Sequence, residues 1–316
     1  GIELSKRRVP LGVIGSIFEA RPEVPIDISA LCIKSGNSVV LRGSKEAVNT
    51  NKALGLVIRS ALSNTKVPLD VVQVIETTDR KVVGEMLKLN EYFDLIIPRG
   101  GAELVRYVAN EATMPAITGG IGVCHTYIDY SVNVEDAIAI IINAKAQAPA
   151  KCNALDTLII HRDSANEVLS KLAPKLERLN VEMRCDPAAY SIASNKSKTA
   201  RKATSQDWGT EFLDLILSIK IVENLGEAIL HIENYGSGHS EAIITSDSSN
   251  AKIFVDQIDA SVVLVNASTR FNDGAQFGLG AEVAISTNKF HARGPMGLKE
   301  LTSYKWIALG NGHTRD

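Results

Sequence analysis

Apolar and polar positions along the chain follow two alternating periods. Short apolar runs, typical of buried strands, occur at residues 12–18, 38–42, 70–76, 93–98, 123–129, 155–161, 214–222, 241–246 and 260–266. Between the first two runs, Val24, Ile28 and Leu31 recur at intervals of four and three, which predicts one buried face of a helix. Helical spacing returns near residues 164–178 and 224–234. Alternating strands and helices indicate parallel sheets, and we expect two doubly wound α/β units rather than one large sheet.

The composition is that of an ordinary globular protein. Hydrophobic residues make up 45% of the 316 positions, which is enough to bury a large core. The 34 basic and 36 acidic residues leave a net charge of −2, and no block of lysine or arginine could neutralise a run of phosphates. No apolar stretch reaches the roughly 20 residues of a membrane-spanning helix, and no signal peptide is visible. We therefore expect a soluble, cytoplasmic protein that binds neither nucleic acid nor membrane.

The segment PAKCNALD, residues 149–156, contains a candidate nucleophile, Cys152. The four cysteines of the chain lie far apart, which predicts reduced thiols and no metal site. A thiol attacks only as thiolate, and both Lys151 and a helix beginning in the segment NALD would favour that form of Cys152. The alternative is a small buried side chain, as expected for Cys32 in a helix and Cys124 in a strand. The residues alone leave both interpretations of Cys152 open.

Ligands of doubly wound sheets bind where loops leave the carboxyl ends of the strands. At the end of the run 38–42, Arg42, Ser44 and Lys45 precede a helix whose N-terminal amides favour an anion, and this arrangement suits a phosphate. The alternative is a solvated strand end with Ser44 as a helix cap. Gly100 and Gly101 follow the run 93–98 and form either a second cofactor loop or a tight turn.

The second half of the chain contains further candidate ligand loops. Residues 266–298 are rich in polar groups and glycine where a core would be aliphatic, which favours close approach of a ligand. Upstream, His239 and Glu241 stand beside a glycine turn that enters a strand. A histidine in this position is either a base or a hydrogen-bonded structural residue.

Several long motifs carry a resemblance to a known family. The most specific is VENLGEAILHIENYGSGHSEAI at residues 222–243, and others are NAKAQAPAKCNALDTLIIH at 143–161 and STRFNDGAQFGLGAEVAISTNKFHARGP at 268–295. Together they resemble the gamma-glutamyl phosphate reductases of the aldehyde dehydrogenase superfamily, over essentially the whole chain.

The resemblance implies an aldehyde dehydrogenase-like fold of two doubly wound parallel-sheet domains, with an N-terminal part missing before Gly1. We expect an NADPH-binding domain at residues 1–122, a catalytic cysteine domain at 123–293, and a return to the cofactor domain at 294–316 that includes an oligomerisation strand. It also implies a homo-dimer or homo-tetramer, and leaves open a glutamate kinase as a fused or separate partner.

The implied reaction is the NADPH-dependent reduction of L-glutamyl 5-phosphate to L-glutamate 5-semialdehyde and phosphate, the second step of proline biosynthesis. By similarity, Cys152 attacks the acyl phosphate and holds the glutamyl group as a thioester for hydride transfer. Hydrolytic relatives keep a general-base glutamate in the strand that corresponds to residues 115–123, where this chain has no carboxylate. The segment from Thr118 through Gly119 and Gly120 to Ile121 also departs from nearer relatives, which puts the conformation of this loop in doubt.

Individual site residues follow from the same resemblance. Arg21 aligns with an oxyanion-binding asparagine, although it could instead bind the charged end of the substrate or pair with Glu19 or Glu23. Positive charge at Arg42 and Lys45 favours the 2′-phosphate of NADPH, and Glu211 is expected to bind the nicotinamide ribose. The candidate substrate ligands are His239, Asn266, Arg270, Glu282 and Arg293. For Arg270 and Arg293, a structural ion pair is the alternative.

Two other functions stay open. A cysteine-dependent aldehyde dehydrogenase that oxidises a free aldehyde would share the fold and a nicotinamide cofactor, but the missing general base argues against it. An inactive structural or regulatory relative would also share the fold, with the altered loop at residues 118–121 as its signature.

Overall fold

The computed structural model describes residues 1–117, 119 and 121–315, and the chain divides into two compact units. Unit 1 comprises residues 1–119 and 278–316, and unit 2 comprises residues 120–277. The sequence predicted that residues 278–293 belong to the domain of Cys152, but they lie in unit 1. The reason is packing, since Val283, Ala284 and Ala292 are buried in the unit 1 core.

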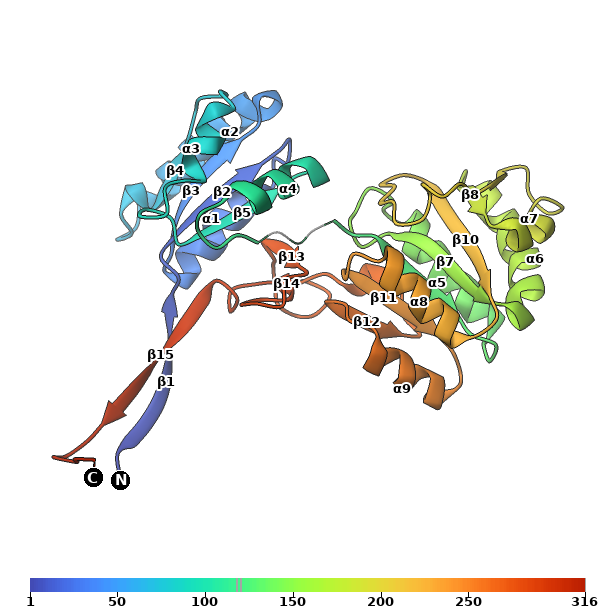
Figure 1. The fold of residues 1–316 in the computed structure, drawn as a ribbon. Helices are drawn as coiled ribbons and strands as arrows, with labels where there is room; N and C mark the ends of the chain where they lie inside the picture. The colour runs from blue at the N-terminus through green and yellow to red at the C-terminus, as the bar shows by residue number, and fades with distance from the viewer. Residues whose placement is uncertain (118, 120, 316) are drawn as a thin grey trace. The chain divides into compact units, whose positions relative to one another are not determined.

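Unit 1 contains a four-stranded parallel sheet with the order β4-β3-β2-β5 (Figure 1). Its strands are β2 (Val13–Phe18), β3 (Ser38–Gly43), β4 (Val72–Val74) and β5 (Leu95–Arg99). Helices α1 (Val24–Ser35) and α2 (Val48–Leu62) pack on one face, and α3 (Lys81–Met86) and α4 (Ala102–Glu111) pack on the other. Strand order and layers match the doubly wound unit predicted for this part of the sequence.

Two small two-stranded sheets complete unit 1. Strands β1 (Glu3–Pro10) and β15 (Thr302–Leu309) pair antiparallel from the two ends of the chain, and β13 (Ala284–Ser286) pairs with β14 (Gly294–Met296). An oligomerisation strand was expected from the sequence where β15 lies, whereas β1 was not predicted. Nearly all side chains of β1 are exposed, so it lacks the apolar run by which the other strands were recognised.

Unit 2 contains a seven-stranded parallel sheet with the order β12-β11-β6-β7-β10-β8-β9 (Figure 1). The strands are β6 (Cys124–Ile128), β7 (Leu155–His161), β8 (Glu182–Cys185), β9 (Ala200–Lys202), β10 (Ile216–Val222), β11 (Ser240–Ile244) and β12 (Val262–Val265). Because β11 and β12 lie beside β6 on the side opposite β7, the chain winds outward in both directions, as a doubly wound sheet requires.

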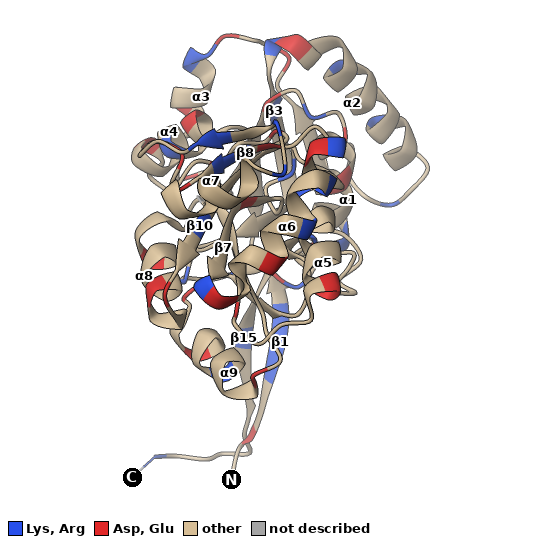
Figure 2. Ribbon diagram, turned by 90° about the vertical axis from the view of Figure 1, so that its right-hand side faces the viewer, with Lys and Arg blue, Asp and Glu red and all other residues tan. Residues whose placement is uncertain are grey.

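Helices cover both faces of the unit 2 sheet. Helices α5 (Val134–Ala146), α6 (Arg162–Arg178) and α7 (Pro187–Ala193) share one core, and α8 (Leu225–Tyr235) and α9 (Ser248–Gln257) share the other. Figure 2 shows both basic and acidic residues along α6 and acidic residues on α5. Lys171, for example, lies 3.2 Å from Glu135 and 3.0 Å from Glu167. In the part of the chain that the structure describes, none of the helices combines the length and apolar character of a membrane span.

Candidate active site

The candidate nucleophile lies in the turn between α5 and β7. Cys152 is partly exposed, whereas Cys32, Cys124 and Cys185 are buried. The sequence predicted a helix beginning at residues 153–156, but these residues form a turn and the start of β7, so Cys152 has no helix N-terminus beside it. Burial raises the pKa of Cys32 and Cys185 to about 12 and that of Cys124 well above its usual range. The three buried thiols are therefore protonated at neutral pH, as expected for small core side chains.

The turn with Cys152 lies at the amino edge of the unit 2 sheet. Cys152 precedes β7, Cys124 opens β6 and His239 precedes β11. The rule that ligands bind at carboxyl ends points to the opposite edge, so these three residues do not lie where that rule places a site. The sequence could have predicted this edge, because Cys152, Cys124 and His239 each stand shortly before or at the start of an apolar run.

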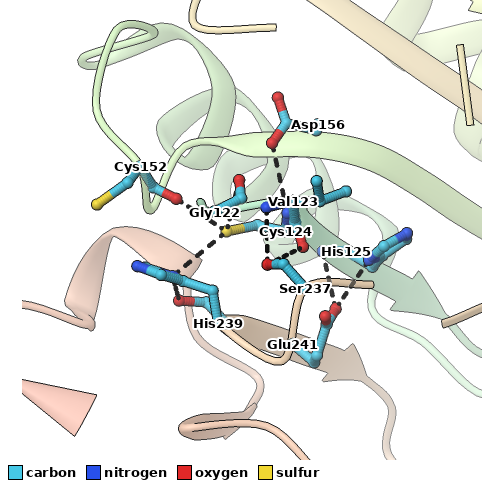
Figure 3. Close-up of polar contacts among 10 residues, drawn as sticks. Gly122, Val123, Cys124, His125, Cys152, Asp156, Ser237, His239 and Glu241 are labelled. Carbon is cyan, nitrogen blue, oxygen red and sulfur yellow. Dashed lines mark hydrogen bonds and ion pairs between the residues drawn. The ribbon is translucent and has the colours of Figure 1, made fainter. Parts of the chain in front are cut away.

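Four consecutive backbone N–H groups beside the turn donate to side-chain oxygens, and Figure 3 shows those of Val123, Cys124 and His125. The donors are residues 122–125, and the acceptors, in order, are Glu211 at 2.9 Å, Ser237 at 2.9 Å, Asp156 at 3.3 Å and Glu241 at 2.9 Å. Asp156 and Glu241 are buried, and burial raises the pKa of both carboxyl groups, that of Asp156 to about 7. Side chains from four parts of unit 2 thus fix the segment that enters β6.

This segment contacts the Cys152 turn directly. The Cys124 thiol lies 3.2 Å from the carbonyl oxygen of Cys152, and a Cβ atom added to Gly122 would lie 1.8 Å from the same oxygen. A glycine is therefore required at position 122 for the turn to lie where it does. On its other side, the turn is held by Asn153, whose amide donates to the carbonyl of Asn272 and whose carbonyl accepts from Thr269.

His239 is a buried, neutral side chain in this arrangement. Burial lowers the pKa of His239 to about 4, so the ring carries no charge at neutral pH. The Ser240 hydroxyl accepts from Asn272 and lies 2.8 Å from Nδ1 of His239. The other ring nitrogen is Nε2. This atom is buried and has no hydrogen-bond partner among the residues that the structure describes. A strong base at His239 is excluded by its low pKa.

Two buried charged residues near Cys152 were not predicted from the sequence. Lys145, in the last turn of α5, lies with Nζ 3.8 Å from Oδ1 of Asp156. Asp156 also accepts from the backbone N–H of Phe212 at 3.1 Å. Burial lowers the pKa of Lys145. The sequence contained a signal for each, since Lys145 lies within an Ala- and Ile-rich segment and Asp156 interrupts the apolar run LDTLIIH.

A cavity of about 440 Å³ lies between α5 and residues 266–276. Asn143, Gln147 and Arg270 are among its lining residues, and Nε of Arg270 donates to Gln147 at 3.1 Å. The predicted substrate ligand Asn266 also borders it, but its amide both accepts from and donates to the backbone of Thr245. The structure therefore brings Arg270 to the cavity with a polar neighbour, whereas the Asn266 side chain is engaged by the fold.

The predicted cofactor residues Arg42, Ser44, Lys45, Gly100 and Gly101 lie at the carboxyl edge of the unit 1 sheet, as expected. Arg42 is buried and donates to the carbonyls of residues 78 and 79 at 3.0 Å each, and Lys45 is exposed. The N–H of Gly101 donates to the carboxylate of Glu19 at 2.7 Å. An acidic side chain of the protein therefore already occupies the turn predicted to bind cofactor.

The other predicted residues are divided between the units. Arg21, Glu282 and Arg293 belong to unit 1, and Glu211 belongs to unit 2, where its carboxylate accepts from Gly122. Of the segment that departs from its relatives, Thr118 and Gly120 lie outside the described residues. Within the described part of the chain, no group of three or more His, Cys, Asp or Glu residues is arranged to hold a metal ion.

Comparison with known proteins decides the family. Residues 2–208 match the model of the aldehyde dehydrogenase family. Over its whole length the chain is 51% identical to the gamma-glutamyl phosphate reductase of Clostridium tetani and 52% identical to that of Roseiflexus castenholzii, covering 75% of each relative. The chain belongs to the gamma-glutamyl phosphate reductases of the aldehyde dehydrogenase family.

Solved structures agree with this membership. The crystal structure of gamma-glutamyl phosphate reductase from Thermotoga maritima matches with a TM-score of 0.95 at 48% identity, covering 100% of this chain and 75% of that one. An acetylating aldehyde dehydrogenase from Geobacillus thermoglucosidasius, at 18% identity and a TM-score of 0.78 over 99% of this chain and 78% of that one, shows the shared fold alone. The predicted family and fold class are confirmed. As a gamma-glutamyl phosphate reductase, the chain is an oxidoreductase of proline biosynthesis, in a family that uses a nicotinamide cofactor.

Proposed function

We propose that this chain reduces L-glutamyl 5-phosphate to L-glutamate 5-semialdehyde and phosphate with NADPH, through a thioester on Cys152. The observation that carries the proposal is the Cys152 turn. Of the four thiols in the chain, only that of Cys152 is not buried, and the turn is fixed by contacts from β6 and from residues 269–272. A fixed, accessible thiol is what nucleophilic catalysis requires.

The residues around Cys152 have definite tasks in this reaction. Sγ of Cys152 attacks the acyl carbon, the bond from that carbon to the phosphate oxygen breaks, and phosphate leaves. We propose that His239 donates from Nε2 to an oxygen of the substrate, since this buried atom has no hydrogen-bond partner among the described residues. Arg270, at the cavity beside α5, is proposed to bind a carboxylate of the glutamyl group.

The cofactor, when bound, supplies the hydride that reduces the thioester. Residues at the end of β3 fit a 2′-phosphate. Nε of Arg42 is buried without a hydrogen-bond partner among the described residues, while its Nη2 donates to two backbone carbonyls. Lys45 would contact the phosphate, with Ser44 beside it and the charge of Arg42 behind it. Binding at Gly100 and Gly101 would require Glu19 to leave Gly101.

Glu211 is proposed to bind the nicotinamide ribose, with its orientation set by the N–H of Gly122. Arg21, Glu282 and Arg293 remain proposed ligands of the oxyanion or the substrate. The homo-dimer or homo-tetramer, the cytoplasmic location and the association with glutamate kinase also remain proposals. The segment predicted for oligomerisation is β15, whose outward side chains include Tyr304 and Trp306.

The test is turnover in the direction that avoids the unstable acyl phosphate. Glutamate 5-semialdehyde, phosphate and NADP should give NADPH, detected by its absorbance, and the rate should depend on phosphate. Cys152→Ala should abolish turnover and retain NADPH binding, whereas the matched variant Cys185→Ala should remain active because that thiol is buried in the core. Phosphate-independent oxidation would indicate a free-aldehyde dehydrogenase. Failure of any substrate combination to turn over would favour an inactive relative.

A further inference from the structure

The position of Cys152 depends on a segment that strand pairing alone does not fix. Residues 122–125 contact the carbonyl of Cys152 through the Cys124 thiol and through the bare backbone of Gly122. The pairing of β6 with β7 shifts register between Cys124 and His125. The sheet ladder is therefore interrupted where the segment meets the turn, and the four side-chain acceptors replace it.

One of these acceptors holds two segments at once. Asp156 accepts from the Cys124 N–H through Oδ2 and from the Phe212 N–H through Oδ1. Phe212 follows Glu211, which is itself the acceptor for the Gly122 N–H. Loss of Asp156 would therefore release Cys124 directly and would also loosen the loop that holds Gly122.

A buried carboxylate in this role needs a compensating charge. Asp156 and Lys145 are 2% and 0% exposed, and the Lys145 ammonium, 3.8 Å from Oδ1, has no hydrogen-bond partner among the described residues. The other titratable groups that influence the pair are Cys124, Glu211 and Asp214. Of all these groups, Lys145 alone is a cation.

We propose that Asp156, with Lys145 as its buried counter-charge, is a positioning residue that fixes the Cys152 nucleophile through residues 122–125 and 211–212. Figure 3 shows the part of this arrangement that joins Asp156 to Cys124 and Cys124 to Cys152. The proposal rests on the proposed function, because it assumes that Cys152 is the nucleophile.

The test compares Asp156→Asn with Asp163→Asn. Asparagine keeps the volume of Asp156 but replaces one of its two acceptor oxygens by an NH₂ group, which faces an N–H donor. Asp163 lies just beyond the opposite end of β7 and is exposed, so its variant is the matched control. We expect kcat/KM to fall about 100-fold in Asp156→Asn, as for a nucleophile displaced by about 1 Å, and to stay within about twofold in Asp163→Asn.

Two further readouts separate positioning from a general loss of structure. Alkylation of Cys152 by iodoacetamide at alkaline pH requires no docked substrate, so its plateau rate should change less than about threefold in Asp156→Asn. Because burial raises the pKa of Asp156 to about 7, kcat/KM should fall more steeply in the wild type than in Asp156→Asn as pH falls through 7.

If Asp156→Asn does not fold, Ser237→Ala tests whether residues 122–125 position Cys152. Ser237 is the uncharged acceptor for the N–H of Val123, so its loss weakens the same segment without exposing a buried charge. We expect a fall in kcat/KM of about fivefold to tenfold. The proposal is overturned if Ser237→Ala and any folded Asp156→Asn both keep wild-type kcat/KM while Cys152→Ala is inactive. Activity in Cys152→Ala would instead overturn the proposed function itself.

Discussion

The two sheets present candidate site residues at opposite edges. In unit 1, residues 19–23, 44–47 and 100–101 follow the carboxyl ends of their strands, where helix N-termini offer N–H groups to anions. In unit 2, Cys152 lies at the amino edge, which α5 approaches with its C-terminus. A helix C-terminus disfavours negative charge, so the fold gives a thiolate no help there. Unit 1 therefore offers backbone N–H groups to an anion, whereas the buried cation of unit 2, Lys145, is paired with Asp156.

Removing that buried cation gives the largest expected effect. Lys145→Met leaves Asp156 buried beside no cation and should lower the free energy of unfolding of unit 2 by about 3 kcal/mol. Lys171→Met, on the exposed face of α6, should cost less than about 1 kcal/mol, although Lys171 pairs with two glutamates. The two tryptophans lie in different units, so Trp208 fluorescence in a Trp306→Phe background reports urea unfolding of unit 2. Equal losses of unfolding free energy in Lys145→Met and Lys171→Met would contradict the predicted difference between a buried and an exposed lysine.

A side chain at Gly122 should displace the nucleophile itself. Gly122→Ala would place Cβ 1.8 Å from the Cys152 carbonyl oxygen, and kcat/KM should fall about 100-fold. In unit 1, Gly84→Ala is the matched control, because its Cβ would meet only the Tyr107 hydroxyl at 3.1 Å, at the end of a side chain that can move. Phosphate-dependent NADP reduction measures both variants. Full activity in Gly122→Ala would show that the turn is not held as described.

Burial of histidine beside the unit 2 sheet should appear in the pH dependence of stability. Burial lowers the pKa of His231 to about 3 and that of His239 to about 4, against about 6.5 in the unfolded chain. Between those values the unfolded chain binds protons that the folded chain does not, so each histidine contributes stability above pH 6.5 that is lost on acidification. Asp156 has the opposite effect on stability. Because its pKa is raised to about 7, the folded chain binds a proton below that pH more readily than the unfolded chain does, and acidification stabilises the fold at this residue.

A single variant isolates the histidine effect. His231→Phe keeps a ring among Trp208, Tyr235 and His125 and removes the titrating group. Between pH 7.5 and pH 5, the wild type should lose about 2 kcal/mol more of its unfolding free energy than the variant does. Urea unfolding followed by circular dichroism at the two pH values measures this difference. Identical losses would mean that His231 is accessible to protons in the folded state.

The smallest expected effect concerns cofactor choice in unit 1. Lys45→Ala should shift the preference for NADPH over NADH by about tenfold, since it removes one exposed charge from a phosphate. Arg42→Met should shift it as well, but with a loss of unit 1 stability, because Arg42 holds the carbonyls of residues 78 and 79. The ratio of kcat/KM for the two cofactors measures both. Unchanged selectivity in the double variant would refute the assignment of these residues to the 2′-phosphate.

The sequence predicted those parts of the molecule that depend on local patterns. Each of the nine apolar runs overlaps a strand, and the spacing of Val24, Ile28 and Leu31 corresponds to the buried face of α1. Strand β1 was missed because its pairing with β15 joins residues about 300 positions apart and buries almost no side chain. Glu19 at Gly101 and Asp156 at Phe212 were missed for a related reason. Such contacts depend on how loops meet in three dimensions, which periodicity does not encode.

The proposal that Cys152 carries the glutamyl group has one direct test. The full-length protein would be mixed with glutamate kinase, ATP and glutamate, which generate L-glutamyl 5-phosphate in place, and then quenched in acid and digested for mass spectrometry. Without NADPH, one glutamyl group should be found on the Cys152 peptide, and it should disappear when NADPH is added. A glutamyl group on another residue, or none on Cys152 in a protein that turns over, would contradict the mechanism.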